Sequence, residues 1–212
     1  MTQDIDRKAL VDHLARLGAE RRILCAIVGA PGAGKSTLAE AVAEELNRRS
    51  PGSAALLPMD GFHYDDLYLV PAGLRPRKGA PETFDTGGLR HVLGRLRVND
   101  EDVVAVPVFD REIEIARAGA RMIPQSARVI VVEGNYLLLT RPPWNTLAES
   151  FDVTVMIDVP EEVLRERLTR RWQHHRLSPD EIRTKLEEND LPNGRIVRVE
   201  SAPADFRIRQ DR

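Results

Sequence analysis

Apolar residues recur along the chain in two patterns, one typical of buried strands and one typical of amphipathic helices. The continuous apolar run Ile23–Val28 predicts a parallel strand that is covered on both faces. Apolar residues at helical spacing predict helices at residues 5–17, where Gly18 is expected to end the helix, and at residues 36–49. Further strands are predicted at 54–59, 103–108, 128–132, 153–159 and 204–209, and further helices at 86–96, 161–174 and 179–189.

The alternation of strands with helices predicts the fold class. It favours an α/β protein that has a parallel sheet with helices on both faces. No linker, internal repeat or low-complexity tract interrupts residues 1–212, so a single domain is expected. Residues 62–85 are rich in Gly, Pro, Tyr and Arg without a clean period, which predicts a long functional loop.

A glycine-rich turn joins the strand Ile23–Val28 to the helix that follows. It reads G-A-P-G-A-G-K-S-T, with the spacing G-x-x-x-x-G-K-[ST], and an ordinary turn beside an exposed lysine is the weaker interpretation. Small residues let the backbone wrap a triphosphate, while consecutive N–H groups and the helix N-terminus supply positive potential. Lys35 is expected to reach the β- and γ-phosphates, and the Ser36 hydroxyl to bind Mg²⁺. The residues expected to hold ATP here are Gly29, Ala30, Pro31, Gly32, Ala33, Gly34, Lys35, Ser36 and Thr37.

Two acidic residues stand at the ends of predicted strands. Carboxyl ends of parallel strands face the ligand crevice, so Asp60 is predicted to accept the proton of an attacking alcohol and to orient it toward the γ-phosphate. Glu133 is predicted to act at Mg²⁺, directly or through water, and to face the substrate. The alternatives are an Asx-turn aspartate before Gly61 and a strand-end glutamate that faces solvent.

Four arginines, at positions 165, 167, 170 and 171, form a cluster on the helix predicted at 161–174. Arg167, Arg170 and Arg171 lie three and four residues apart and share one side of that helix. A lid over residues 165–180 is therefore predicted to close over ATP. Arg167 and Arg171 would stabilise transition-state charge, and Arg170 would contact the nucleotide. A solvated basic face is the alternative.

Charged residues in the irregular segments are candidates for the acceptor site. They are His63, Arg77, Lys78, Asp85 and Arg111. Each residue alone is weak evidence, because charged loops are usually only solvated. Together, after a phosphate loop, they predict a polar, hydroxyl-bearing acceptor that can itself carry negative charge.

Composition narrows the class of protein further. The 212 residues are 42% hydrophobic and 30% charged, which are globular values. The net charge of −2 argues against a protein built around nucleic-acid binding. The lone Cys25 lies in an apolar run, which predicts a buried thiol and a reducing compartment. No segment reaches 18 apolar residues and the N-terminus has no apolar signal region, so a cytoplasmic protein without membrane contact is expected.

These motifs together resemble a known family, the P-loop small-molecule kinases that include uridine kinase, phosphoribulokinase and bacterial type I pantothenate kinase. The similarity rests on the glycine loop, Asp-Gly-Phe-His at 60–63, Arg-Lys-Gly-Ala-Pro-Glu-Thr-Phe-Asp at 77–85, Pro-Val-Phe-Asp-Arg at 107–111 and Val-Glu-Gly-Asn-Tyr at 132–136. It implies the three-layer fold of P-loop NTPases with a five-stranded parallel sheet, Asp60 as the base and an arginine lid. Glu-Gly-Asn-Tyr-Leu-Leu-Leu, with Asn-Asp-Leu-Pro-Asn at 189–193, most resembles a bacterial subgroup described as fructose-transport-associated, or fructokinase-like.

Departures from the family pattern bear on the acceptor. Asp110 and Arg111 stand where pantothenate kinases have a Ser-His pair, and Gly61 stands where uridine kinases usually have Ser. We therefore expect a kinase that uses ATP and Mg²⁺ to phosphorylate a hydroxyl of a small polar metabolite, with a sugar favoured. Pantothenate kinase, nucleoside kinase and, from a different class, a nucleotide-binding regulatory ATPase stay open. The oligomeric state, monomer or homodimer, is open too.

Overall fold

A six-stranded parallel sheet forms the centre of the molecule. The computed structural model describes residues 2–210. In spatial order the strands are β1 (Gln3–Asp4), β8 (Phe206–Arg209), β7 (Val153–Asp158), β2 (Ile23–Val28), β6 (Val129–Gly134) and β3 (Ala54–Pro58). All neighbouring pairs are parallel. The α/β class is confirmed, but the expected count of five strands is wrong, because the two-residue β1 pairs with β8 and adds a sixth.

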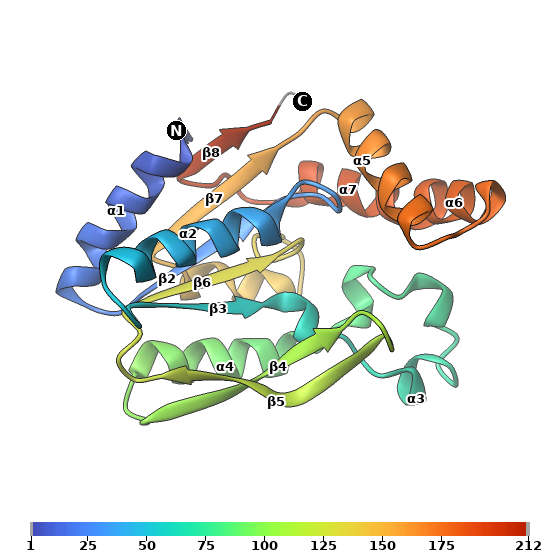
Figure 1. Ribbon diagram of the computed structural model, residues 1–212. Helices are drawn as coiled ribbons and strands as arrows, with labels where there is room; N and C mark the ends of the chain where they lie inside the picture. The colour runs from blue at the N-terminus through green and yellow to red at the C-terminus, as the bar shows by residue number, and fades with distance from the viewer. Residues whose placement is uncertain (1, 211–212) are drawn as a thin grey trace.

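Helices cover both faces of this sheet (Figure 1). Alternate residues of the central strand β2 divide between two cores: Leu24, Ala26 and Val28 lie in one, Ile23, Cys25 and Ile27 in the other. The helices are α1 (Arg7–Glu20), α2 (Lys35–Arg49), α3 (Asp66–Leu69), α4 (Thr86–Val98), α5 (Glu161–His174), α6 (Pro179–Lys185) and α7 (Leu191–Glu200). Helices α1 and α2 pack in the core that contains Cys25, and α4 packs in the other core. The buried thiol predicted for Cys25 is confirmed, and burial raises its pKa.

A β-hairpin lies outside the main sheet, and only its first strand was predicted from the sequence. Strands β4 (Val103–Asp110) and β5 (Ile115–Pro124) pair with each other in antiparallel register and form a separate two-stranded sheet. Val104, Val106 and Ile123 bury one side of the hairpin against the core that contains α4. The sequence pattern predicted a strand at 103–108 and the next one only at 128–132, so β5 was not predicted. Strand β5 escapes the sequence pattern because most of its side chains are exposed and few are large and apolar.

Two helix boundaries differ from the expected ones for identifiable reasons. Helix α1 does not end at Gly18 but continues to Glu20. A Cβ atom on Gly18 would lie 2.7 Å from Cγ2 of Val129, so this glycine permits close helix–sheet packing instead of ending the helix. The helix expected at 179–189 begins with the predicted cap, since Ser178 and Glu181 form a capping box. It then continues through a π-helical turn, Leu186–Asp190, into α7.

Arg22 is a buried structural residue that the sequence analysis did not single out. Its guanidinium donates hydrogen bonds to the carbonyl oxygens of Ala127, Leu96, Pro124 and Gln125. These carbonyls belong to the last turn of α4, to the last residue of β5 and to the connection between β5 and β6. Arg22 thus ties the hairpin and α4 to the start of the central strand.

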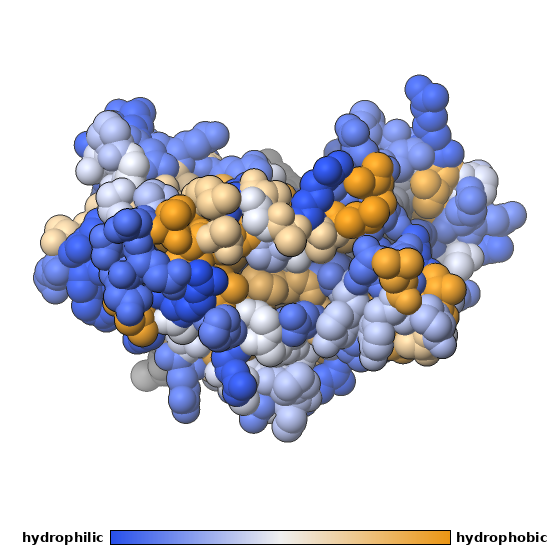
Figure 2. All heavy atoms as spheres, turned by 90° about the horizontal axis from the view of Figure 1, so that it is seen from below, coloured by the Kyte–Doolittle hydropathy of each residue, from blue (hydrophilic) through white to orange (hydrophobic). Residues whose placement is uncertain are grey.

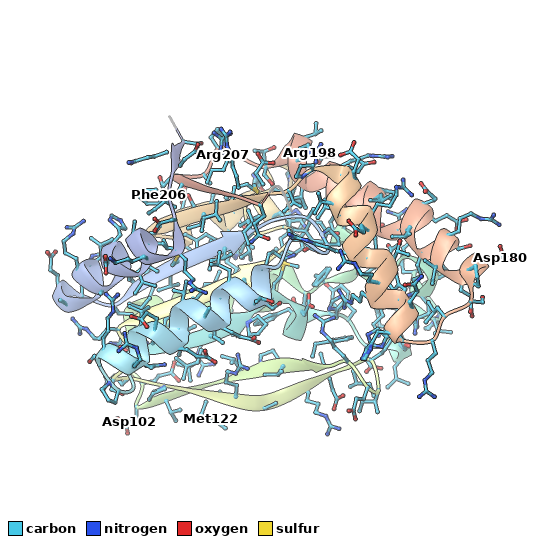
Figure 3. All side chains as sticks on the ribbon, turned by 45° about the horizontal axis from the view of Figure 1, so that its top comes forward. Asp102, Met122, Asp180, Arg198, Phe206 and Arg207 are labelled. Carbon is cyan, nitrogen blue, oxygen red and sulfur yellow. The ribbon has the colours of Figure 1, made fainter. Side chains whose placement is uncertain are left out.

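The face of the molecule that Figure 2 shows is predominantly hydrophilic. Seen from the side of the hairpin, hydrophobic residues form separate small areas on a hydrophilic face (Figure 2). Asp102 lies at one end of the hairpin, and Asp180, on α6, lies beyond the carboxyl ends of the main strands (Figure 3). Across residues 2–210, no helix combines the length and the apolar character needed to span a bilayer.

Candidate active site

Three parallel strands end at the same edge of the sheet, and each leads into a segment of one cavity. Strand β2 leads into the glycine loop, β3 into a 3₁₀ turn (Met59–Phe62) that carries Asp60, and β6 ends in Glu133 and Gly134. Ile27 and Pro58 both pair in register with Glu133, which places Glu133 between the other two strand ends. The cavity has a volume of about 400 Å³. Its charged lining residues are Lys35, Arg75, Lys78, Arg111, Arg167, Arg171 and Lys185, with Asp60, Glu114, Glu133 and Asp190.

The glycine loop forms the floor of this cavity. Gly32 and Gly34 have φ angles of 79° and 84°, which favour glycine because a side chain is strained in the left-handed region. Helix α2 begins at Lys35 with Gly34 as its N-cap, and no side chain of the described residues caps it. Its first N–H groups are therefore available to an anion, as a phosphate cradle requires. Lys35 Nζ donates a hydrogen bond of 3.0 Å to the carbonyl of Ala30, within the loop itself.

Close backbone contacts fix the position of Asp60. A Cβ atom on Gly61 would lie 2.4 Å from the carbonyl oxygen of Pro107, so the hairpin packs directly on the Asp60 turn. A Cβ atom on Gly134 would lie 2.4 Å from Cβ of Met59, so the end of β6 packs on the same turn from another side. The two glycines thus hold the Asp60 turn between β6 and the hairpin.

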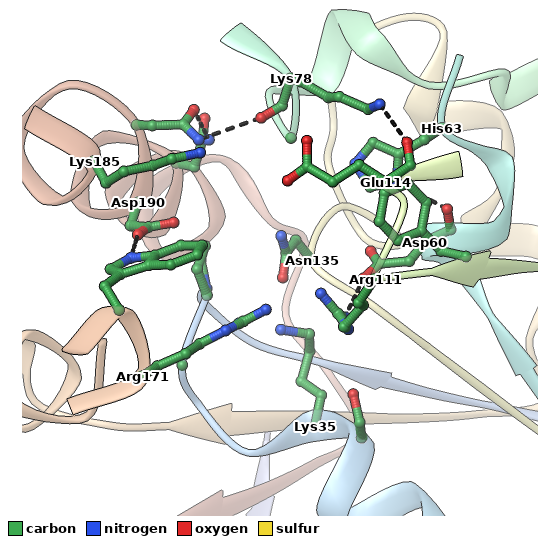
Figure 4. A pocket seen from close by; sticks show the side chains of 18 of the residues that line it. Lys35, Asp60, His63, Lys78, Arg111, Glu114, Asn135, Arg171, Lys185 and Asp190 are labelled. Carbon is green, nitrogen blue, oxygen red and sulfur yellow. Dashed lines mark hydrogen bonds and ion pairs between the residues drawn. The ribbon is translucent and has the colours of Figure 1, made fainter. Parts of the chain in front are cut away.

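Asp60 is a half-buried carboxylate surrounded by positive charge (Figure 4). Arg111 Nη2 donates a hydrogen bond of 2.6 Å to its Oδ2 atom. Burial alone would raise the pKa of Asp60, but His63, Arg111 and Lys35 outweigh burial and hold this pKa below its ordinary value. The His63 ring lies beside the turn, with Nδ1 2.8 Å from the Asp60 carbonyl oxygen. Asp60 is therefore ionised at neutral pH, as a proton acceptor must be.

Glu133 is a buried carboxylate with the opposite shift. Burial raises its pKa, the charge of Asp60 raises it further, and Lys35 opposes both effects. The Ser36 hydroxyl donates a hydrogen bond of 3.2 Å to Glu133 Oε1. A hydroxyl and a carboxylate side by side are oxygen ligands of the kind that Mg²⁺ takes together with waters and substrate phosphates. Within residues 2–210, no group of three or more His, Cys, Asp or Glu residues is placed to hold a metal.

The predicted lid arginines occupy different places on α5. Arg167 and Arg171 line the cavity, whereas Arg170 is exposed and pairs with Glu166 on the same helix. The Arg171 side chain points toward Lys35 (Figure 4). Burial lowers the pKa of Arg171, and the neighbouring charge of Arg111 lowers it further. Arg167 donates a hydrogen bond of 2.9 Å to the Gln210 side chain, next to the glycine loop.

The acceptor-site candidates divide in the same way. His63, Lys78 and Arg111 line the cavity, whereas Arg77 and Asp85 do not. Asp85 is exposed and caps α4 by accepting a hydrogen bond from the Gly88 amide. Arg77 pairs with Glu82, also at the surface.

Four residues join the loop at 62–85 to the tip of the hairpin, and we call them the loop–hairpin network: Asp66, Arg75, Lys78 and Glu114. Arg75 donates hydrogen bonds of 2.6 Å to both Asp66 and Glu114. Lys78 donates to the Asp66 carboxylate at 2.6 Å and to the Glu114 carbonyl at 2.7 Å. Lys78 and Glu114 line the cavity on the side opposite Lys35 (Figure 4).

Several lining residues on the segment after the lid helix were not predicted from the sequence. Asp190 is buried and accepts a hydrogen bond of 2.7 Å from Trp172 Nε1, and Arg171 and Lys185 each lie 5.1 Å from the Trp172 ring centroid. Asn193 donates a hydrogen bond of 3.0 Å to Asn189. The sequence at 189–193 could have indicated Asp190 and the two asparagines, because it resembles the fructose-transport-associated subgroup. No role was predicted for any of its side chains.

Comparisons with known proteins show what the chain is similar to in sequence. The chain is 35% identical over 204 residues to YggC of Escherichia coli (strain K12), a match that covers 94% of this chain and 84% of YggC. It is 32% identical over 200 residues to a Schizosaccharomyces pombe protein provisionally named a uridine kinase, covering 90% of this chain and 84% of that protein. The pantothenate kinase of Limosilactobacillus reuteri subsp. reuteri is 27% identical over 148 residues, which are 69% of this chain and 48% of that enzyme. No protein-family model matches the chain.

A solved structure gives the same result at the level of the fold. A protein of Silicibacter sp. TM1040, provisionally described as a fructose transport system kinase, is 40% identical, with a TM-score of 0.84. The match covers 93% of this chain and 98% of that protein. The fold and the site thus define a P-loop phosphotransferase. The chain belongs to the family of P-loop small-molecule kinases that includes uridine kinase, phosphoribulokinase and type I pantothenate kinase. It is an ATP-dependent kinase whose phosphate acceptor is an alcohol group of a small molecule.

Proposed function

We propose that Asp60 is the general base of this kinase and that the acceptor hydroxyl binds between Asp60 and the γ-phosphate of ATP. The observation that carries the proposal is the position of the Asp60 carboxylate in one cavity with the glycine loop and Lys35. In the transfer step the acceptor oxygen forms a bond to the γ-phosphorus, and the bond between that phosphorus and the β–γ bridging oxygen breaks. ADP leaves, and the hydroxyl proton moves to Asp60.

Positive side chains on the other sides of the cavity stabilise the charge of the transferred group. Lys35 and Arg171 converge from the glycine loop and from α5, so both would contact the γ-phosphate when ATP is bound. When Mg²⁺ is bound it neutralises phosphate charge, and Ser36 and Glu133 are the residues that would hold it. Arg170 lies at the surface and would contact the nucleotide only after the lid has moved.

The nucleoside of ATP fits a second opening next to the glycine loop. Gly34, Thr37, Arg167 and Gln210 are among the residues that line it. A phosphate chain that lies along the α2 N-terminus and leaves the cavity on this side would place the base beside the hydrogen-bonded side chains of Arg167 and Gln210. The hydrogen bond between these two side chains would then hold the lid helix against the nucleotide. In this account residues 1–212 act as one kinase domain, and residues 165–180 are the moving lid.

The acceptor favoured by the site is a sugar or a close relative of one. The acceptor end is small and polar, with His63, Lys78, Arg111 and Asn135 around it, and it suits a compact polyol. The description of the Silicibacter protein as a fructose transport system kinase supports the same choice. Pantothenate is disfavoured because Asp110 and Arg111 occupy the positions of the Ser-His pair of pantothenate kinases.

A screen of ADP release tests the proposal. Purified protein with Mg²⁺ and ATP is assayed with sugars, sugar acids, sugar phosphates, nucleosides and pantothenate, and each rate is divided by the rate without acceptor. The proposal expects a rise of about 10²-fold or more with the right sugar-type acceptor. Rapid ATP hydrolysis that no acceptor accelerates would contradict it and would favour a regulatory ATPase. Preference for a nucleoside or pantothenate would overturn the choice of acceptor.

A further inference from the structure

Asp60, the proposed general base, forms an ion pair with Arg111. Arg111 follows β4 at the start of the hairpin turn and binds one carboxylate oxygen of Asp60 at 2.6 Å. The Asp60 side chain is 25% exposed and that of Arg111 is 52% exposed, so solvent reaches the pair from the cavity. A general base needs an oxygen that is free to accept the hydroxyl proton. In the ligand-free protein, one oxygen of Asp60 is already taken.

Other cations at the acceptor end have protein carboxylates as partners. Arg75 and Lys78 pair with Asp66 and Glu114 in the loop–hairpin network, so neither of these two cations is paired with Asp60. Arg111 differs because its partner is the residue that must act in catalysis. It reaches Asp60 from the hairpin, whereas Lys35 and Arg171 enter the cavity from the glycine loop and from α5 (Figure 4).

The side chains that line the cavity carry an excess of positive charge, which favours an anionic ligand. Among the described residues, seven Lys and Arg side chains and four Asp and Glu side chains line it. ATP uses part of this positive excess near Lys35 and Arg171. On the acceptor side Arg75 and Lys78 are paired with Asp66 and Glu114, so Arg111 is the cation whose exchange for an incoming anion would release Asp60.

We propose that the acceptor carries an anionic group, a carboxylate or a phosphate, and that this group takes Arg111 from Asp60 when the acceptor binds. The inference rests on the proposed function of the same site and narrows its substrate class to sugar acids or sugar phosphates. The exchange keeps the Arg111 fork paired with an oxyanion, which it can bind through two parallel hydrogen bonds. It also frees Oδ2 of Asp60, so that both carboxylate oxygens can accept the hydroxyl proton. A neutral sugar offers Arg111 only neutral acceptors, which are weaker partners than the carboxylate it would have to leave.

Matched pairs of acceptors test the charge requirement. Fructose is compared with fructose 6-phosphate, and glucose with gluconate, so that the phosphate and carboxylate forms of the anion are distinguished. We expect one anionic member to have a kcat/KM at least about 10²-fold above its neutral partner, a factor typical of one charge-assisted contact. A neutral sugar as the best acceptor would overturn the inference and leave the kinase assignment intact.

Arg111→Gln separates this role from a merely structural one. With the anionic acceptor, its KM should rise more than about tenfold while the KM for ATP changes little, and the preference for the anion should shrink. Arg117→Gln is the matched control, because Arg117 lies on the same hairpin and pairs with Asp110 at the surface. It should leave both KM values unchanged. A rise in the KM for ATP alone in Arg111→Gln would overturn the inference.

A second measurement needs no identified acceptor. Phosphite and acetate are small anions without the carbon skeleton of a substrate, and with Mg²⁺ and ATP in place the glycine loop is already filled. If either anion takes Arg111, Asp60 can act on a water in the position of the hydroxyl. Acceptor-independent ATP hydrolysis should then rise several-fold in the wild type and not in Arg111→Gln. No stimulation by either anion, together with no anionic preference among the acceptor pairs, would overturn the inference.

Discussion

Trp172 on α5 and Asp190 at the end of the π-helical turn are joined by a hydrogen bond of 2.7 Å, donated by the indole nitrogen. Asp190 is buried, and burial raises its pKa, an effect that the Trp172 hydrogen bond and the charge of Arg171 oppose. The pair connects the lid helix to the segment that carries Asn189 and Asn193. The position of Arg171, the residue before Trp172, depends on this connection.

Trp172→Phe should therefore destabilise the protein and lower kcat. The change leaves a buried carboxylate without its donor, which costs about 1–3 kcal/mol of unfolding free energy. Asp190→Asn in the same background should recover part of this loss, because a neutral amide tolerates burial better than a carboxylate does. Urea unfolding of the two single variants and the double variant gives the coupling energy. Unchanged unfolding free energy in Trp172→Phe would contradict the role of the pair.

Glu133→Gln should make the protein more stable at neutral pH and inactive. The pKa of Glu133 is raised in the folded state, so the folded protein favours the protonated form and loses stability as pH rises from the unfolded pKa through the folded one. The neutral amide removes that loss. We expect a Tm a few degrees higher than wild type at pH 7.5, with the difference shrinking toward pH 4. A variant less stable than wild type at pH 7.5 would show that Glu133 stabilises the fold as an anion.

Gly61→Ser should damage the acceptor side of the site more than the ATP side. The new Cβ atom would meet the Pro107 carbonyl at 2.4 Å, so the hairpin with Arg111 must shift. We expect about 1–3 kcal/mol of destabilisation and a larger rise in the KM for the acceptor than in the Kd for ATP. Gly94→Ala is the control, because nothing lies within 4 Å of the Cβ position at Gly94. Equal effects on acceptor and ATP would argue against hairpin displacement.

Arg22→Met should cost stability without changing the affinity for ATP. The substitution keeps the apolar stem and removes the donors to four carbonyls, a loss of roughly 3 kcal/mol. Thermal unfolding checks the first expectation and calorimetric titration with ATP the second. Arg90→Met, at an exposed site on α4, is the control and should be close to neutral.

Much of the fold follows from local pattern. The run at β2 is buried residue by residue, and its alternate side chains divide between two cores, as a strand covered on both faces requires. The hairpin was harder because β5 is largely exposed and its pairing with β4 depends on long-range contacts. The end of α1 was misjudged because Gly18 serves packing against Val129, which no local pattern reveals.

The candidate site divides along the same line. The glycine loop, Asp60 and Glu133 were predicted because a motif and the geometry of parallel strands place them together. The acceptor side depends on contacts between segments far apart in sequence, such as Arg111 with Asp60 and Arg75 with Glu114. Arg77 and Lys78 are neighbours in sequence, yet Arg77 pairs at the surface and Lys78 lines the cavity. Loop conformation, which composition does not determine, decides between the two.

The central claim is that Asp60 takes the proton of the acceptor hydroxyl, and Asp60→Asn measured with the best acceptor tests it most directly. The account predicts that acceptor-dependent ADP release falls by about 10²–10⁴-fold while the Kd for ATP by calorimetric titration changes little. Asp102→Asn, at the far end of the hairpin, should match the wild type in both quantities. Transfer by Asp60→Asn at a rate close to that of the wild type would contradict the account.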